Sequence, residues 1–106
     1  LENYVFEATA PLPEPELFER LVAETYATMK MPQMQVGRVE GQLLRQLVAL
    51  SRARCVVELG TFTGYSTLAM ASALPSDGVI HTCDVDPVAT AVARRYFDQS
   101  PWGDRM

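Results

Sequence analysis

The stretch from Val56 to Ser66, "VVELGTFTGYS", decides the fold. It overlaps a run, Arg54 to Leu59, of apolar and β-branched character without two-residue alternation, which is typical of a parallel strand covered on both faces. The run carries an acid near its end, Glu58, and two glycines follow it, Gly60 and Gly64. Glycines at this place let the chain turn tightly into a helix, and they let a ligand or another backbone approach closely.

Helix and strand patterns surround this turn. Apolar residues at helical spacing predict a helix from Leu17 to Met29, after a proline-rich irregular lead-in, and a second helix from Val39 to about Leu50. Ser66 to Leu74 is rich in helix formers, and Val79 to Val85 has the pattern of a second strand. Asp86, followed by a proline, predicts the N-cap of a last helix.

This order of elements defines the fold class that we expect. A strand, helix, strand, helix sequence is an α/β pattern, and parallel strands joined in this way form a right-handed Rossmann-like βαβα unit. The chain has 106 residues, enough for one core. We therefore predict a single partial domain, with a helical segment over residues 1–53 and the βαβα unit over residues 54–106.

Composition excludes several kinds of partner. The formal net charge is −4 and the basic residues are scattered, which argues against nucleic acid. No apolar run is long enough to cross a membrane, and the N-terminus lacks the pattern of a signal peptide. Cys55 and Cys83 form neither a CxxC motif nor a metal cluster with His81. We expect packed, reduced thiols, a strand histidine without a chemical role, and a cytoplasmic protein.

Two polar features predict a ligand at the turn. A strand-to-helix turn presents free backbone N–H groups to an anionic group, and the hydroxyl of Ser66 adds a donor there. Asp84 ends the next strand, so it lies beside the turn, where its carboxylate can accept hydrogen bonds from a ribose diol. The two features together predict a nucleoside that carries an acid group.

Spacing decides which nucleoside fits. The dinucleotide motif G-x-G-x-x-G is absent, because three residues separate Gly60 from Gly64, and no lysine completes a phosphate-binding loop. Neither NAD nor ATP fits this pattern. S-adenosylmethionine fits it, with the methionine carboxylate near the glycine turn and the ribose at Asp84.

The chain resembles the cation-dependent class I O-methyltransferases, the family of caffeoyl-CoA and catechol O-methyltransferases and their bacterial relatives. The resemblance is carried by "EGQLL", "ELGTFTGYS", "ALPSDG" and "CDVDP", which lie in the order and spacing of that family between Glu40 and Pro87. It implies a Rossmann-like methyltransferase fold, of which this chain is the N-terminal, cofactor-binding half. It also implies S-adenosylmethionine as cofactor and methyl transfer to a hydroxyl of a small molecule.

The resemblance implies roles for particular residues. Asp84 matches the acid that holds the ribose, and Met34 and Val36 match positions that close over the cofactor. The positions that line the methionine end of the cofactor are Glu58, Gly60, Thr61, Phe62, Gly64, Tyr65 and Ser66.

Structural alternatives stay open beside these roles. If Glu58 has no role at the cofactor, it is a strand-end acid whose carboxylate accepts hydrogen bonds from turn amides. If Phe62 and Tyr65 do not contact the cofactor, they pack against the sheet. In the same case, Met34 covers apolar surface.

The chain departs from the family in what it lacks. Family members continue into later strands, which supply the aspartates that bind a divalent cation, and we find no metal ligand and no catalytic residue here. Without those strands the central strand has an unpaired edge and partly bare apolar faces, and thus an uncovered surface. We therefore expect either a homo-oligomer or a missing C-terminal half to cover it. Two functions remain open: the cofactor-binding part of an O-methyltransferase, inactive by itself, or a non-catalytic oligomeric module for nucleoside binding or interaction.

Overall fold

Two parallel strands organise the chain, whose computed structural model describes all residues, 1–106. Strands β1 (Cys55–Leu59) and β2 (Val79–Cys83) pair with Val56 beside Ile80 and Leu59 beside Cys83. Helix α4 (Tyr65–Ala71) connects them, and α5 (Pro87–Gln99) follows β2. The predicted Rossmann-like βαβα unit with parallel strands is therefore confirmed.

Helices precede and follow this unit. They are α1 (Glu2–Ala8), α2 (Pro15–Thr28), the short 3-10 helix η1 (Pro32–Met34), α3 (Arg38–Ser51) and, at the end, the 3-10 helix η2 (Gly103–Arg105). Asp86 caps α5 as predicted, because its carboxylate accepts hydrogen bonds from the N–H groups of Val88 at 2.9 Å and Ala89 at 3.2 Å. None of the helices has the length and apolar character that a membrane span requires.

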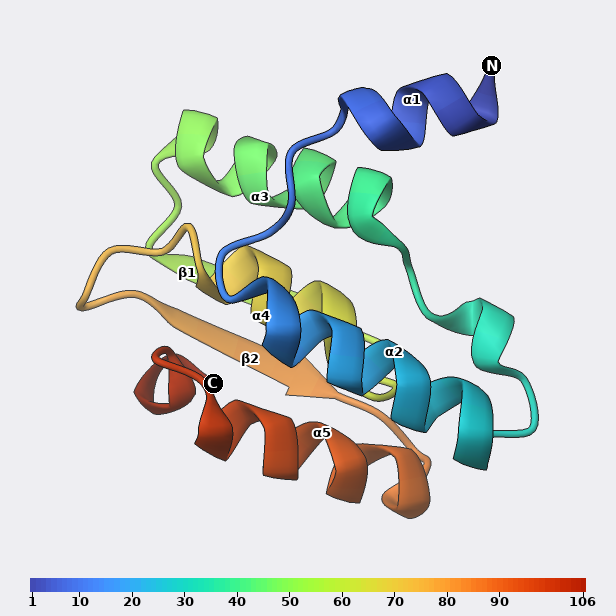
Figure 1. The fold of residues 1–106 in the computed structure, drawn as a ribbon. Coiled ribbons are helices and arrows are strands. Elements are labelled where there is room, and N and C mark those ends of the chain that lie inside the picture. Colours follow the sequence, from blue (N-terminus) through green and yellow to red (C-terminus); the bar gives the residue numbers. More distant parts are fainter.

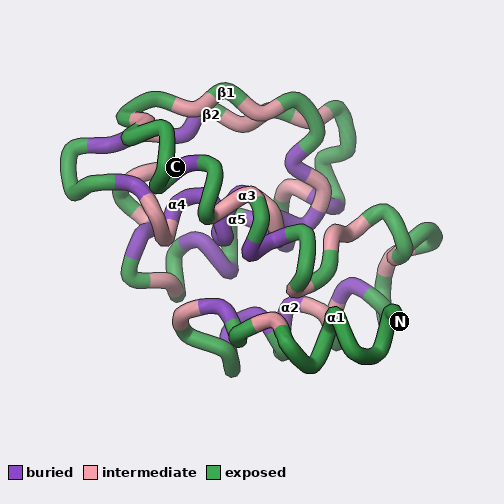
Figure 2. The backbone as a smooth tube through the Cα atoms, turned by 90° about the horizontal axis from the view of Figure 1, so that it is seen from above, coloured by how far each residue is buried: buried purple, intermediate pink, exposed green.

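All helices lie on one side of the sheet. Figure 1 shows their order along the chain, and Figure 2 shows both strands along one margin, with α3, α4 and α5 beneath them and α1 and α2 farther out. One continuous apolar core joins these layers, with Leu21 from α2, Leu68 from α4, Ile80 from β2 and Phe97 from α5 among its members.

The opposite face of the sheet is bare. Val57 is 70 % exposed and Leu59 is 83 % exposed, and the neighbouring Cys55 and Cys83 are exposed free thiols. One face of β1 is therefore bare, in agreement with the expectation that its apolar faces are partly bare in this chain, whereas the prediction of packed cysteines is wrong. An apolar run predicts a strand that suits burial on both faces, but here every helix packs on the same face.

Other boundaries differ in smaller ways. Helix α1 falls in the lead-in that we expected to be irregular, and none of its residues is buried. Strand β2 ends at Cys83 rather than at Val85, because the Asp84 carboxylate accepts a hydrogen bond from the N–H of Asp86 and turns the chain.

Candidate functional site

The turn after β1 has left-handed backbone at three positions. The φ angles are +99° at Gly60, +49° at Phe62 and +95° at Gly64. The N–H groups of Gly60 and Thr61 both donate to the carbonyl of Cys83, at 2.8 and 3.2 Å. The turn is thereby fastened to the carboxyl end of β2, as the predicted site requires.

The two glycines serve different purposes. A Cβ atom on Gly60 would meet nothing within 4 Å, so the space in front of this residue is open. A Cβ atom on Gly64 would lie 2.6 Å from Cε1 of Phe97 and 3.0 Å from Cβ of Ala93. Gly60 therefore leaves room for a ligand, whereas Gly64 lets α5 pack closely against the turn.

Glu58 binds three hydroxyl groups. Its carboxylate accepts hydrogen bonds from Ser66 at 2.5 Å, from Thr82 at 2.8 Å and from Thr67. It is satisfied by hydroxyls of α4 and β2, and not by turn amides. The Ser66 hydroxyl is thus occupied, but the backbone N–H groups of Tyr65 and Ser66 make no hydrogen bond within the chain. Both are free donors beside the turn.

Asp84 lies beside the turn and is oriented by it. One carboxylate oxygen accepts the N–H of Phe62 at 2.8 Å, and the other accepts the N–H of Asp86 at 3.0 Å. These backbone hydrogen bonds, that of Phe62 first, hold the pKa of the half-buried Asp84 below its ordinary value. A carboxylate oxygen has two lone pairs, so an acceptor position remains on each oxygen for a ligand hydroxyl.

Most of the predicted cofactor residues line one small cavity of about 90 Å³. Its wall consists of Met34, Gln35, Val36, Gly60, Thr61, Phe62, Thr63, Tyr65 and Ser66. Asp84 lines an adjoining cavity of about 310 Å³, which shares Thr61 with the first. Glu58 and Gly64 lie behind the turn and line neither cavity. Tyr65 is buried and Phe62 is half-buried, so both also contribute to packing.

A buried polar network holds the loop before α3 against the turn. The amide nitrogen of Gln35 donates to the hydroxyls of Thr25 at 2.9 Å and Thr63 at 3.0 Å, and these two hydroxyls lie 2.9 Å apart. Gln35 stands between Met34 and Val36, so the network fixes both beside the turn. Sequence patterns missed it, because polar residues on three separate elements carry no periodic signal.

Replacing Thr63 with valine tests this network. We expect Thr63→Val to lower the free energy of unfolding by about 1–2 kcal/mol, because Thr63 is fully buried and its partners lose a hydrogen bond. Urea denaturation followed by circular dichroism measures the change. The exposed Thr28, whose hydroxyl bonds only to Glu24 of its own helix, gives the matched control Thr28→Val. Equal stability of the two variants would contradict the role of the network.

The site contains no metal centre. No group of three or more His, Cys, Asp or Glu side chains is gathered closely enough to hold an ion. The divalent cation that the resemblance implies therefore finds no ligand set among these residues.

The fold and the turn define a Rossmann-like α/β unit of the methyltransferase type. The family model described as O-methyltransferase matches residues 7–106. The chain belongs to this O-methyltransferase family.

Individual relatives agree with this assignment. Caffeoyl-CoA O-methyltransferase of Populus kitakamiensis is 33 % identical over 107 residues, which cover 100 % of this chain and 46 % of the relative. Catechol O-methyltransferase of Niastella koreensis is 41 % identical over 70 residues, which cover 66 % of this chain and 32 % of that protein.

A solved structure extends the likeness to three dimensions. The O-methyltransferase of Bacillus cereus, determined in complex with SAH, superposes with a TM-score of 0.85 at 28 % identity. The superposition covers 97 % of this chain and 46 % of that one. The chain spans less than half the length of each of these relatives.

Proposed function

We propose that this chain is the S-adenosylmethionine-binding part of an O-methyltransferase that methylates a hydroxyl of a catechol-like small molecule. The observation that carries the proposal is the open space in front of Gly60 beside the Asp84 carboxylate, which the N–H of Phe62 orients. The names of the relatives and the SAH complex of the Bacillus cereus enzyme support the cofactor and the type of reaction.

Each end of the cofactor has matching groups. The methionine carboxylate accepts hydrogen bonds from the free N–H groups of Tyr65 and Ser66. The ribose diol donates to the open acceptor positions of Asp84. Val85, the next residue, is 99 % exposed and offers apolar surface to the adenine ring. Met34 and Val36 close over the methionine end from the loop.

The chemistry assigned to this chain is binding and orientation. In the proposed reaction a hydroxyl oxygen attacks the sulfonium methyl carbon in line, the carbon–sulfur bond breaks, and S-adenosylhomocysteine and a proton are released. The chain holds the methyl donor in position. No step is assigned to a divalent cation, because the residues present do not form a site for one. We therefore propose that the chain by itself is inactive.

Calorimetry with S-adenosylmethionine and S-adenosylhomocysteine tests cofactor binding directly. We expect both to bind, because they share the carboxylate and the ribose that the turn and Asp84 recognise. Affinity is expected to be weak, since the adjoining cavities are small and the chain spans less than half of its relatives. Absence of binding at millimolar ligand would exclude the proposed cofactor role.

The bare face of the sheet favours a second candidate, a non-catalytic oligomeric module. Large apolar side chains are exposed there and on the outside of α3, including Val57, Leu59 and Leu47. Either a second copy or a C-terminal half covers them in the proposed protein, which we place in the cytoplasm. A mass measurement in solution distinguishes the cases, because a soluble, well-folded monomer would contradict self-association.

A further inference from the structure

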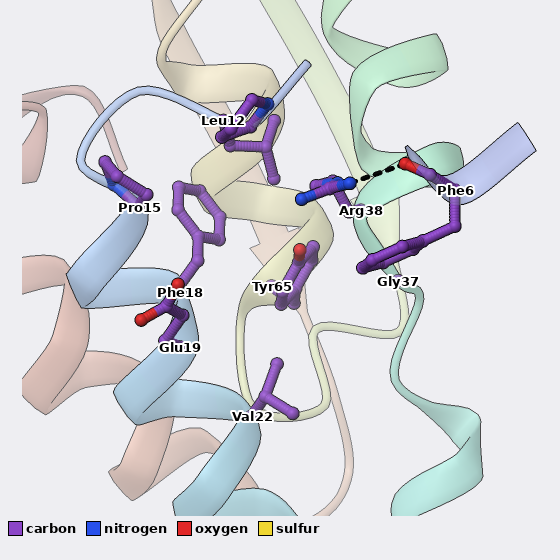
Figure 3. Close-up of a pocket in the computed structure, with 10 residues that line it drawn as sticks. Phe6, Leu12, Pro15, Phe18, Glu19, Val22, Gly37, Arg38 and Tyr65 are labelled. Atoms are coloured by element: carbon purple, nitrogen blue, oxygen red, sulfur yellow. Dashed lines mark hydrogen bonds between the residues drawn. The ribbon is translucent and has the colours of Figure 1, made fainter. Parts of the chain in front are cut away.

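A second cavity lies between the N-terminal segment and the start of α4. Its volume is about 350 Å³, within the range of small-molecule pockets. Three aromatic rings, two prolines and two aliphatic side chains form most of its wall. Figure 3 shows the labelled ones converging from α1, the segment between α1 and α2, α2 and α4, with Arg38 at the start of α3.

Tyr65 brings an unsatisfied hydroxyl to this cavity. The residue is only 5 % exposed, and its hydroxyl makes no hydrogen bond with the protein. Burial raises the pKa of Tyr65 to about 12, against the opposing effect of the Arg38 charge. The phenol is therefore neutral at physiological pH, and its O–H is a free donor. The hydroxyl oxygen is not itself buried, so a ligand or water in the cavity can accept from it, whereas Nε of the neighbouring Arg38 is buried without a hydrogen-bond partner.

Arg38 brings a positive charge without a counter-ion. Its guanidinium lies 3.8 Å from the centre of the Phe6 ring, and Nη2 donates to the Phe6 carbonyl. The chain has two ion pairs, Arg54–Asp77 and Arg95–Glu24, and Arg38 belongs to neither. Figure 3 shows the Tyr65 hydroxyl and the Arg38 guanidinium facing the same space. An uncompensated cation and a free hydroxyl together suit a carboxylate.

We propose that this cavity binds a small aromatic monocarboxylate. Its carboxylate accepts hydrogen bonds from Arg38 and Tyr65, and its ring packs against Phe18 and the neighbouring apolar wall. Glu19 is exposed at the margin and disfavours a second negative charge on the ligand. The site is distinct from the proposed cofactor turn, although the Tyr65 ring also lines the cavity there, and it does not depend on cofactor binding.

Fluorine NMR with a matched pair of probes tests the proposal on the whole chain. We expect para-fluorobenzoate to bind at least about tenfold more tightly than para-fluorobenzamide, which has the same shape without the charge. Arg38→Gln is expected to raise the Kd for the benzoate about tenfold and Tyr65→Phe about fivefold. Arg94→Gln is the control, because the exposed Arg94 also lies over a phenylalanine, 5.8 Å from the Phe97 ring centre, and is expected to leave the Kd unchanged.

Two results would overturn the proposal. Equal affinity for the benzoate and the benzamide, or no binding of either, would mean that the cavity recognises no carboxylate. Unchanged benzoate affinity in Tyr65→Phe would mean that the Tyr65 hydroxyl does not bind the carboxylate. If Arg38→Gln fails to fold, the probe pair on the unmodified chain and the Tyr65→Phe variant still decide the question.

Discussion

Asp84→Asn is expected to weaken the binding of S-adenosylmethionine at least about tenfold. A carboxylate accepts hydrogen bonds from both ribose hydroxyls, and a charged hydrogen bond contributes about 1.5–3 kcal/mol, while an amide offers one acceptor and no charge. Calorimetric titration measures the change. Asp98→Asn is the control, because Asp98 is exposed near the end of α5 and carries the same charge away from the turn. Equal affinity in both variants would mean that Asp84 does not hold the ribose.

The lowered pKa of Asp84 adds a dependence on pH. Its hydrogen bonds from Phe62 and Asp86 favour the charged form in the folded state. Their contribution to stability is therefore present above the pKa of an unfolded aspartate, and it is lost as the pH falls through the lower folded value. We expect wild type and Asp84→Asn to differ most in stability at neutral pH and to converge in acid. A constant difference across this range would contradict the pKa shift.

Gly64→Ala is expected to lower the free energy of unfolding by about 2–5 kcal/mol. A left-handed conformation costs an alanine about 1–2 kcal/mol, and crowding a packed site adds about 1–3 kcal/mol. Both apply here, since φ is +95° and the new methyl would lie 2.6 Å from the Phe97 ring. Urea denaturation measures the loss.

Gly60→Ala separates the cost of the left-handed backbone from the cost of crowding. Its φ is +99°, but the methyl would meet no atom within 4 Å, so only the backbone cost of about 1–2 kcal/mol applies. We expect this variant to fold and to bind S-adenosylmethionine less tightly, because the methyl occupies the space in front of the turn. A loss of stability as large as that of Gly64→Ala would show that packing against α5 is not the reason for glycine at position 64.

Local signals predicted the elements that position the site. The apolar run of β1, the two glycines and the Asp86 N-cap each act through neighbouring residues, so a single sequence contains them. They were sufficient to predict the parallel βαβα unit and to place Asp84 beside the turn. The family resemblance added the loop residues Met34 and Val36, which no periodicity indicates.

The features that the sequence did not predict depend on contacts between residues far apart in the chain. The Gln35 network and the hydroxyls around Glu58 join three elements each, and nothing local marks their members. The exposure of Cys55 follows from where the helices pack, which an apolar run does not indicate. Tyr65 was predicted for the cofactor turn, yet its unbonded hydroxyl beside Arg38 is visible only in three dimensions.

The continuous core couples the unfolding of the helical segment to that of the βαβα unit. Leu21 and Val48 of the helical segment share one apolar cluster with Ile80 and Phe97 of the βαβα unit. Most members of this cluster lie in the βαβα unit, so we expect the helical segment to unfold together with that unit in one cooperative transition. A ligand held at the turn thereby stabilises the helices at the other end of the chain as much as the residues that it touches.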